Sequence, residues 1–164
     1  MRLLKRLVLA ALLLSTAMPA FSAPREIYPD PAQAKSDLAV AFKTAAAGHK
    51  RIILDFGGNW CGDCLVLDMY FHNAQNLPLL ERGFVLVHVN VGHFDANLDI
   101  VGKYGIPLQK GVPALAVLSE RGKLIYSQAG EFEKMRNMEP SSVTAFLAKW
   151  RPGAKGCSVV AVSC

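Results

Sequence analysis

Cys61 and Cys64, two cysteines separated by two residues, are the strongest candidates for chemistry in this sequence. The residues after Cys61 have a helical pattern, so Cys61 is expected at the N-terminus of a helix and Cys64 one turn further along. Unpaired backbone N–H groups and the positive end of the helix dipole would favour a thiolate on Cys61 and make it the attacking sulfur. Cys64, on the same side and less exposed, could then resolve a mixed disulfide. This spacing favours thiol–disulfide exchange, and Gly62 would let a partner backbone come close.

Asp55 stands near the end of an apolar run, six residues before Cys61. A carboxylate at such a position costs free energy unless it has a function or a partner. Its spacing could place it beneath the helix that begins at Cys61. Kept partly protonated by burial, it could accept and return the proton of Cys64. The alternative is an aspartate at the end of a strand that faces solvent.

Metal binding is the main competing chemistry for the two thiols. A structural zinc site needs a second pair of ligands, and His72, His88 and His93 are not spaced as such a pair. His88 is interpreted as a strand residue on the less apolar face. No resident metal and no organic cofactor are expected, although Cys61 and Cys64 could act as soft ligands for Cu(I). A copper-binding or copper-delivery protein and a non-catalytic interaction module therefore remain alternatives to an enzyme.

Residues 1–22 have the order of a secretory signal peptide: a basic start, an apolar run at 7–14, and small residues before the expected cut. The apolar run is shorter than the about 18 residues that a membrane-spanning helix needs. Cleavage is expected after Ser22, with Ala20 and Ala23 nearly as suitable. The protein is therefore expected to be exported, to the periplasm if the source is a Gram-negative bacterium, and not to stay in the membrane.

The net charge of the chain comes largely from this leader. The 164 residues contain 18 Lys and Arg and 13 Asp and Glu, and Arg2, Lys5 and Arg6 supply three of the five net positive charges. The remainder has no dense basic run with interleaved aromatic residues, which argues against a nucleic-acid-binding protein. A monomer is expected.

The rest of the chain alternates between helical and strand patterns. Helices are expected at residues 31–48, 61–74, within 94–106 and at 141–151, and strands at 51–56, 84–91, 112–118 and 123–128. The first two strands would be parallel with a right-handed crossover, and the last two would form an antiparallel hairpin. Strand 84–91 is expected in the centre of the sheet because it is rich in Val and Leu. The fold class is therefore α/β, with a mixed sheet and helices on both faces.

The stretches "LDFGGNWCGDC" and "GVPALAVLSERGKLIYSQAGE" resemble the thioredoxin superfamily, in its exported bacterial branch. The resemblance covers roughly residues 34–150 and implies a thioredoxin-like fold. It divides the chain into a signal peptide (1–22), an extended lead-in (23–33), a thioredoxin-like domain (34–152) and a C-terminal tail (153–164). It also implies that Cys61 is the nucleophile, Cys64 the resolving thiol and Asp55 the buried proton acceptor.

The resemblance implies a substrate-binding region around the dithiol as well. Pro113 would be the cis-proline of the family, with the backbone of Val112 beside it in contact with substrate. From the residues alone the alternative is an ordinary trans proline of an edge strand, since cis bonds before proline are a small minority. Trp60 would flank the exposed sulfur, and Gly62 and Gly130 would line the groove. The implied activity is thiol–disulfide exchange with cysteine-containing protein substrates, with reduction as the expected direction, and a second redox protein would reset the dithiol.

Three features depart from the family pattern. The residue before Cys64 is Asp63, whose negative charge disfavours a thiolate on Cys61 and would shift the potential toward the reducing side by at most tens of mV; it could equally be only a favourable acid in the first turn of the helix. The connection formed by residues 91–111 is long, and it could shape substrate choice or be a tolerated loop. Cys157 and Cys164 in the tail are expected to form a structural disulfide, with a second redox pair as the alternative.

Overall fold

The computed structural model describes residues 26–128 and 130–154. In chain order its elements are η1 (Pro31–Gln33), α2 (Ala34–Gly48), β1 (Arg51–Gly57), α3 (Gly62–Phe71), α4 (Leu77–Gly83), β2 (Phe84–Asn90), α5 (Leu98–Lys103), η2 (Leu108–Lys110), β3 (Ala114–Leu118), β4 (Leu124–Ser127), η3 (Met135–Asn137) and α6 (Pro140–Trp150). The predicted leader and the predicted pair Cys157 and Cys164 lie outside the described residues.

The four strands form one mixed sheet in the order β2-β1-β3-β4. β1 pairs with β2 in parallel, and β3 pairs with both β1 and β4 in antiparallel orientation, as the sequence predicts. The prediction that strand 84–91 is central is wrong, because β2 is an edge strand of this sheet. Its Val and Leu content reflects helices packed over both of its faces, with α2 on one and α4 on the other, rather than two neighbouring strands.

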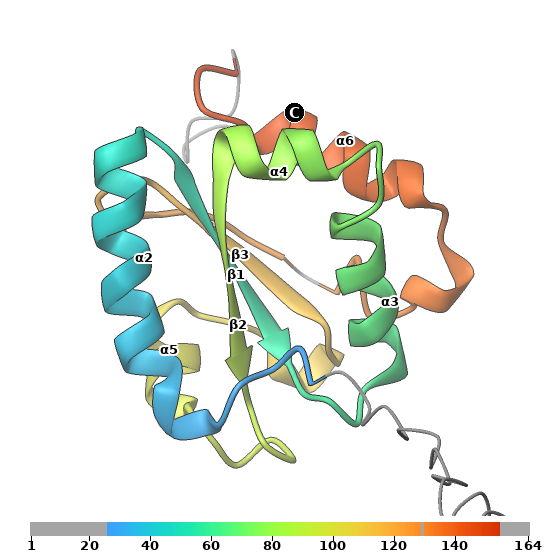
Figure 1. Cartoon of the computed structure of the whole chain (residues 1–164). Coiled ribbons are helices and arrows are strands. Elements are labelled where there is room, and N and C mark those ends of the chain that lie inside the picture. Colours follow the sequence, from blue (N-terminus) through green and yellow to red (C-terminus); the bar gives the residue numbers. More distant parts are fainter. Residues whose placement is uncertain (1–25, 129, 155–164) are drawn as a thin grey trace, which may run out of the picture.

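Helices cover both faces of the sheet and create two hydrophobic cores (Figure 1). Alternate residues of β1 point to opposite faces. Ile52, Leu54 and Phe56 belong to the core beneath α2 and α5, whereas Ile53 packs with α3, α4 and α6. The same alternation turns Asp55 toward the face that α3 covers.

The helix predicted from Cys61 onward is shorter than expected, and the helix that follows it was not predicted. The helix predicted over 61–74 ends at Phe71, and a second helix, α4, follows after a short turn. α4 has only seven residues and contains Pro78, so it offers too few turns for a periodic signal. Asn76 before it donates hydrogen bonds to the carbonyls of Tyr70 and Pro140, so tertiary contacts fix this turn.

The segment that precedes α2 is held against the sheet by asparagine side chains. Asn59 accepts a hydrogen bond from the N–H of Tyr28 (3.0 Å) and donates one to its carbonyl (2.8 Å). Asn90 and Asn97 donate to two further carbonyls of the same segment. Tyr28 is consequently buried, although the sequence places it in an extended lead-in.

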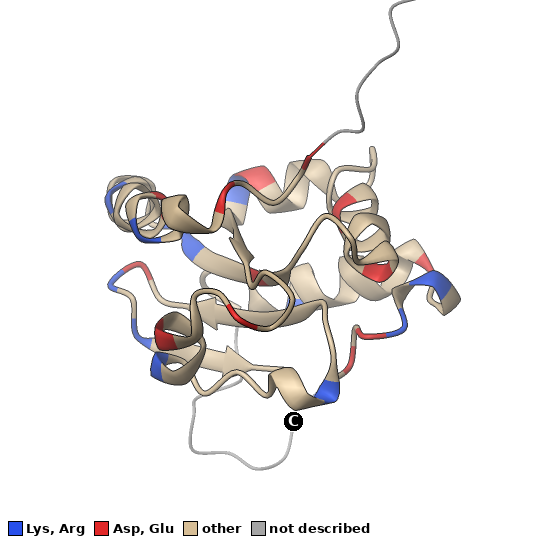
Figure 2. Cartoon of the chain, turned by 90° about the horizontal axis from the view of Figure 1, so that it is seen from below, with Lys and Arg blue, Asp and Glu red and all other residues tan. Residues whose placement is uncertain are grey.

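Charged residues lie mainly on helices and loops, and acidic and basic segments alternate around the molecule in the view of Figure 2. None of the helices within residues 26–128 and 130–154 is both long and apolar enough to cross a membrane.

Candidate functional site

Cys61 and Cys64 form a disulfide at the N-terminus of α3, with their Cα atoms 5.2 Å apart. Cys61 is the N-cap residue, and its Sγ accepts a hydrogen bond from the backbone N–H of Cys64 (3.1 Å). In the reduced protein this N–H and the helix dipole would stabilise a thiolate on Cys61. Both cysteines are buried, Cys61 with 6% of its surface exposed and Cys64 with none, so the more exposed of the two is the one predicted to attack.

The loop before β3 brings Val112 and Pro113 to the disulfide. The Val112–Pro113 peptide bond is cis, and the carbonyl oxygen of Val112 lies 3.6 Å from Cys61 Sγ. The backbone that the family resemblance assigns to substrate binding is therefore beside the sulfur of Cys61.

Trp60 lies at the exposed side of the site, with 46% of its surface accessible. Its indole N–H donates to the carbonyl of Gly92 (2.7 Å), and its ring stacks on His93 with centroids 5.3 Å apart. Phe94 packs beside the same indole. The long connection that departs from the family pattern thus begins against Trp60.

Gly130 has a φ of +100°, a conformation that favours glycine. A Cβ at this position would lie 3.3 Å from the carboxylate of Glu133 and 3.4 Å from Lys110, so Gly130 sits beside η2. Its contact with a substrate stays a prediction.

Asp63 is paired with Arg136 of η3, a contact that the sequence did not indicate. The backbone N–H of Arg136 donates to one carboxylate oxygen (2.8 Å), and its guanidinium nitrogens lie 3.1 and 3.2 Å from the other. Burial acts to raise the pKa of Asp63, but the hydrogen bonds and the charge of Arg136 outweigh it and hold that pKa below its ordinary value. The Asp63 carboxylate is therefore charged, and the positive charge of Arg136 compensates it. This offsets the destabilisation of the Cys61 thiolate that was expected from Asp63 alone.

Asp55 is fully buried, so the alternative of a solvent-facing aspartate is wrong. The hydroxyl of Tyr28 donates to Asp55 Oδ2 (2.8 Å), and Nδ1 of His88 lies 3.0 Å from the same oxygen. Burial, reinforced by the charge of Asp55, raises the pKa of Tyr28 well above its ordinary value, so its hydroxyl stays a donor. Oδ1 of Asp55 accepts no hydrogen bond from the described residues.

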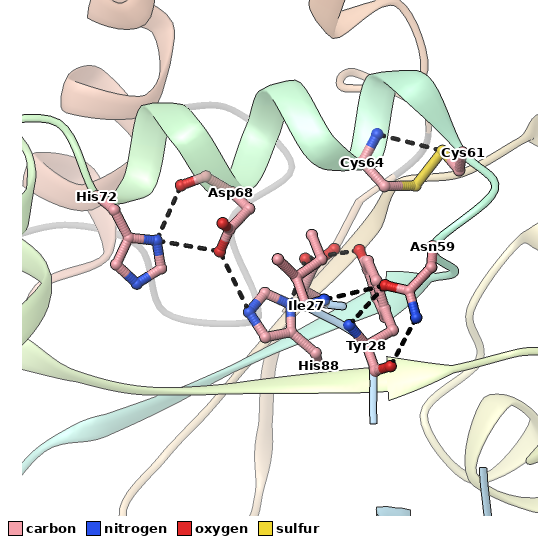
Figure 3. Close-up of polar contacts among 9 residues, drawn as sticks. Ile27, Tyr28, Asn59, Cys61, Cys64, Asp68, His72 and His88 are labelled. Carbon is pink, nitrogen blue, oxygen red and sulfur yellow. Dashed lines mark hydrogen bonds and ion pairs between the residues drawn. A yellow bond between two sulfur atoms is a disulfide. The ribbon is translucent and has the colours of Figure 1, made fainter. Parts of the chain in front are cut away.

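His88 is a member of this cluster rather than a plain strand residue (Figure 3). Its other ring nitrogen, Nε2, lies 3.5 Å from Asp68 Oδ1. Burial disfavours the charged imidazolium, but the hydrogen bonds and charges of Asp55 and Asp68 outweigh it and raise the pKa of His88 to about 9. At neutral pH, His88 is therefore a buried cation between two carboxylates.

Tyr28 and Asp68 are residues of the site that were not named from the sequence, and His88 was interpreted only as a strand residue. One signal was available: Asp68 follows Cys64 by four residues, so both lie on one face of the helix. The contact between His88 and Asp55 depends on the pairing of β1 with β2, where the two residues are direct neighbours, and no local pattern sets that register.

No group of three or more His, Cys, Asp or Glu side chains in the described part of the chain is arranged to hold a metal ion.

Comparison with known proteins agrees with this geometry. A family model described as thioredoxin-like matches residues 33–119, more than half of the chain. The solved structure of a disulphide isomerase from Xylella fastidiosa Temecula1 is 36% identical, covers 77% of this chain and 98% of its own, and superimposes with a TM-score of 0.73.

Curated relatives match over shorter stretches. A protein disulfide-isomerase from Zea mays is 32% identical over 94 residues, which are 57% of this chain but only 18% of that protein. The chain therefore spans less than a fifth of the length of this relative. A thioredoxin from Chlorobaculum thiosulfatiphilum is 28% identical over 85 residues, 52% of this chain and 70% of the relative. With the family match over more than half of its length, the chain belongs to the thioredoxin-like family.

Proposed function

We propose that this protein is a thiol–disulfide oxidoreductase that exchanges its Cys61–Cys64 pair with cysteine-containing proteins outside the cytoplasm. The observation that carries the proposal is the disulfide at the start of α3, with the carbonyl of Val112 beside the more accessible sulfur. The likeness to a structure that is named a disulphide isomerase supports the same chemistry.

The reaction exchanges bonds between sulfur atoms. The Cys61 thiolate attacks a substrate disulfide, one substrate sulfur leaves as a thiolate, and a mixed disulfide forms. Cys64 loses its proton and attacks Cys61 Sγ; the bond to the substrate breaks, and its electron pair stays on the substrate sulfur. The substrate is reduced by two electrons and the dithiol is oxidised. A second protein would return two electrons to the pair.

The residues around the sulfur atoms would hold the substrate. An extended substrate segment would lie against the backbone of Val112 next to Pro113, with Trp60 on one side. Gly62 and Gly130 would leave room for the substrate backbone. Asp55 would accept the proton that Cys64 loses and later return it.

The direction of electron flow and the location are finer parts of the proposal. Reduction was expected from Asp63, and the charge of Arg136 offsets that argument. The equilibrium reduction potential of the Cys61–Cys64 pair decides the direction of electron flow. A value near about −270 mV marks a reductant, and a value near about −120 mV marks a strong oxidant. Export would be supported by a purified protein whose mass and N-terminal sequence correspond to cleavage near Ser22.

Insulin reduction by a limiting dithiol tests the activity. The reference is the full chain with Cys157 and Cys164 changed to serine, which keeps only the proposed active pair. We expect it to accelerate insulin precipitation, and Cys61→Ser to abolish the acceleration. Equal and slow reduction by the reference protein and by Cys61→Ser would eliminate the enzyme proposal.

A further inference from the structure

A row of polar side chains leads from the resolving cysteine through the interior to the surface (Figure 3). Its members come from four parts of the chain: Tyr28 from the segment before α2, Asp55 from β1, His88 from β2, and Asp68 of α3 with His72, the residue that caps the end of that helix. Buried polar residues that form a connected network are costly to leave unpaired, so a continuous row of them is a feature to explain.

The first link joins Cys64 to Tyr28 across Gly57. A Cβ placed on Gly57 would lie 2.7 Å from Cys64 Sγ and 2.5 Å from the hydroxyl oxygen of Tyr28. Both atoms therefore border the same small space, which exists because residue 57 has no side chain. The tyrosine hydroxyl also donates to Asp55, so the same hydroxyl borders the space next to the sulfur and contacts the carboxylate.

The second link joins Asp55 to His88. The Oδ2 atom that accepts from Tyr28 lies 3.0 Å from His88 Nδ1, and the ring of Tyr28 packs edge-on against the imidazole. The other oxygen of Asp55, which is buried and accepts no hydrogen bond from the described residues, offers a second position for a proton.

The third link leads outward along α3. Asp68 Oδ1 lies 3.5 Å from His88 Nε2 and 3.0 Å from Nδ1 of His72. That nitrogen of His72 is also 2.8 Å from the Asp68 carbonyl, so it carries a hydrogen and donates. The Asp55 side chain is fully buried, those of His88 and Asp68 are 16% and 9% exposed, and that of His72, at the outer end, is 38% exposed.

We propose that Tyr28, Asp55, His88 and Asp68 form a proton relay between Cys64 and solvent, with His72 at its outer end. The proposal rests on the proposed thiol–disulfide exchange and assigns positioning and proton-transfer roles to residues within it.

The relay keeps the charge of the buried cluster constant. When Cys64 attacks Cys61, Tyr28 takes the Cys64 proton as it gives its own to Asp55. His88, now facing one carboxylate instead of two, releases its Nε2 proton toward Asp68 and solvent. Asp55 and His88 each become neutral, so no net charge builds up inside. Asp55 then passes its proton to His88, which restores the ion pairs of the oxidised protein. When a partner later reduces the disulfide, a proton from solvent returns to Cys64 along the same row.

Titratable groups face His88 from each element packed against it, and their positions are consistent with this proton transfer. Asp55 faces it from β1, Asp68 from α3 and Tyr28 from the N-terminal segment. Asp37 of α2 lines the surface hollow that His88 also borders. Among these, only the two carboxylates at its ring nitrogens form ion pairs with it.

A two-phase reaction with dithiobis(nitrobenzoate) separates the relay from the rest of the mechanism. In the reduced full chain with Cys157 and Cys164 changed to serine, Cys61 attacks the reagent first, at a rate proportional to reagent concentration. Cys64 then displaces the second coloured thiolate at a rate independent of it. We expect Tyr28→Phe, His88→Gln and Asp68→Asn to slow this second phase at least about tenfold and to leave the first within about twofold. Tyr104→Phe and His49→Gln are the matched controls, and both phases should stay unchanged.

The pH profile excludes a merely structural effect. In the reference protein the second phase should vary little between about pH 6 and pH 8, because the relay supplies the base. In His88→Gln and Asp68→Asn it should rise with hydroxide concentration, about tenfold per pH unit. Second phases that match the reference in rate and pH profile would overturn the relay while leaving the oxidoreductase intact. Absence of both phases in the reference protein would instead remove the proposed function.

Discussion

Gly57 ends β1 at the point where the side chains of Tyr28 and Cys64 meet. A side chain here would collide with the hydroxyl of Tyr28 and with Cys64 Sγ, since even a Cβ would lie closer to both than atoms in contact can approach. Two glycines precede Asn59 in this loop, but only Gly57 has such neighbours from distant parts of the chain. The residue is therefore a steric requirement for bringing the resolving sulfur and the tyrosine together.

Gly57→Ala should consequently impair both stability and exchange. We expect a loss of about 1 to 3 kcal/mol in the free energy of unfolding, typical of overpacking in a core, and a slower release step by Cys64. Urea unfolding of the oxidised protein and insulin reduction measure the two effects. Gly102→Ala is the matched control: no atom lies within 4 Å of its Cβ position in α5, so it should be neutral or slightly stabilising. A Gly57→Ala protein as stable and as active as this control would contradict the packing argument.

Asp63 and Arg136 set the charge beside Cys61 as a pair. The side chain of Arg136 is largely exposed, so solvent and salt screen its contribution. The guanidinium also comes within 3.7 Å of the position that a Cβ on Gly62 would take, so it borders the approach to the dithiol. Removal of Asp63 should therefore favour the Cys61 thiolate, and removal of Arg136 should disfavour it.

We expect Asp63→Asn to make the reduction potential less negative, because the remaining arginine favours the Cys61 thiolate and hence the reduced form. Arg136→Gln should make it more negative. Each shift should be about 20 mV at most, since exposed pairs contribute up to about 1 kcal/mol. Equilibration with glutathione or dithiothreitol measures the potentials, and the double variant should lie near the starting value. Shifts of the same sign in both single variants would show that charge at this pair does not set the potential.

The segment before α2 brings Tyr28 to the site, and tertiary contacts alone hold it in place. It has no strand pairing, and the side chains of Asn59, Asn90 and Asn97 bind its backbone to the rest of the fold. Asn59 lies two residues before Cys61, so the loop that carries the dithiol also fixes Tyr28.

Asn59→Ala should release this segment. It removes two bonds accepted from the N–H groups of Ile27 and Tyr28 and one donated to the Tyr28 carbonyl. At about 1 kcal/mol for each hydrogen bond, we expect a loss of roughly 2 to 3 kcal/mol in the free energy of unfolding. Amide hydrogen exchange at Tyr28 should accelerate as well. Asn137→Ala, at an exposed position in η3, is the control, and equal stability of the two variants would rule out the anchoring role.

The elements that the sequence predicts well are those with a strong local signal. The runs 51–56 and 84–91 become β1 and β2 in the predicted parallel pairing, and the hairpin of β3 and β4 follows from its turn. The dithiol at a helix start, the buried Asp55 and the loop at Val112 were also predictable, because each has a motif. The edge position of β2, the short α4 and the pairing of Asp63 with Arg136 were not, because they depend on which distant elements pack together.

In the whole molecule, the polar cluster joins the sheet to the helical layer. Asp55 and His88 lie on neighbouring strands, and Asp68 extends the cluster to α3. The rest of this interface is a hydrophobic core, so the ion pairs of His88 with Asp55 and Asp68 are charged groups buried between the sheet and the helices. Their contribution to folding must depend on whether His88 is protonated.

The sign of this dependence follows from the raised pKa of His88. A histidine with a pKa of about 9 in the folded protein and about 6.5 in the unfolded chain binds its proton more tightly when folded. The resulting stabilisation is fully present below about pH 6.5 and is lost as the pH rises through about 9. It amounts to something on the order of 3 kcal/mol.

Urea unfolding of the oxidised protein across this pH range measures the effect, with Cys157 and Cys164 changed to serine so that no thiol titrates. The reference protein and His49→Gln should both lose stability between about pH 6.5 and pH 9, whereas His88→Gln should be less stable at low pH and nearly flat. A flat profile in the reference protein would mean that His88 is neutral in the folded state. It would then have no proton to release when Asp55 takes the one from Cys64, and the relay would fail together with the stability argument. The charge that stabilises the fold at neutral pH is thus the same charge that lets a thiolate form at Cys64 without adding net charge to the interior.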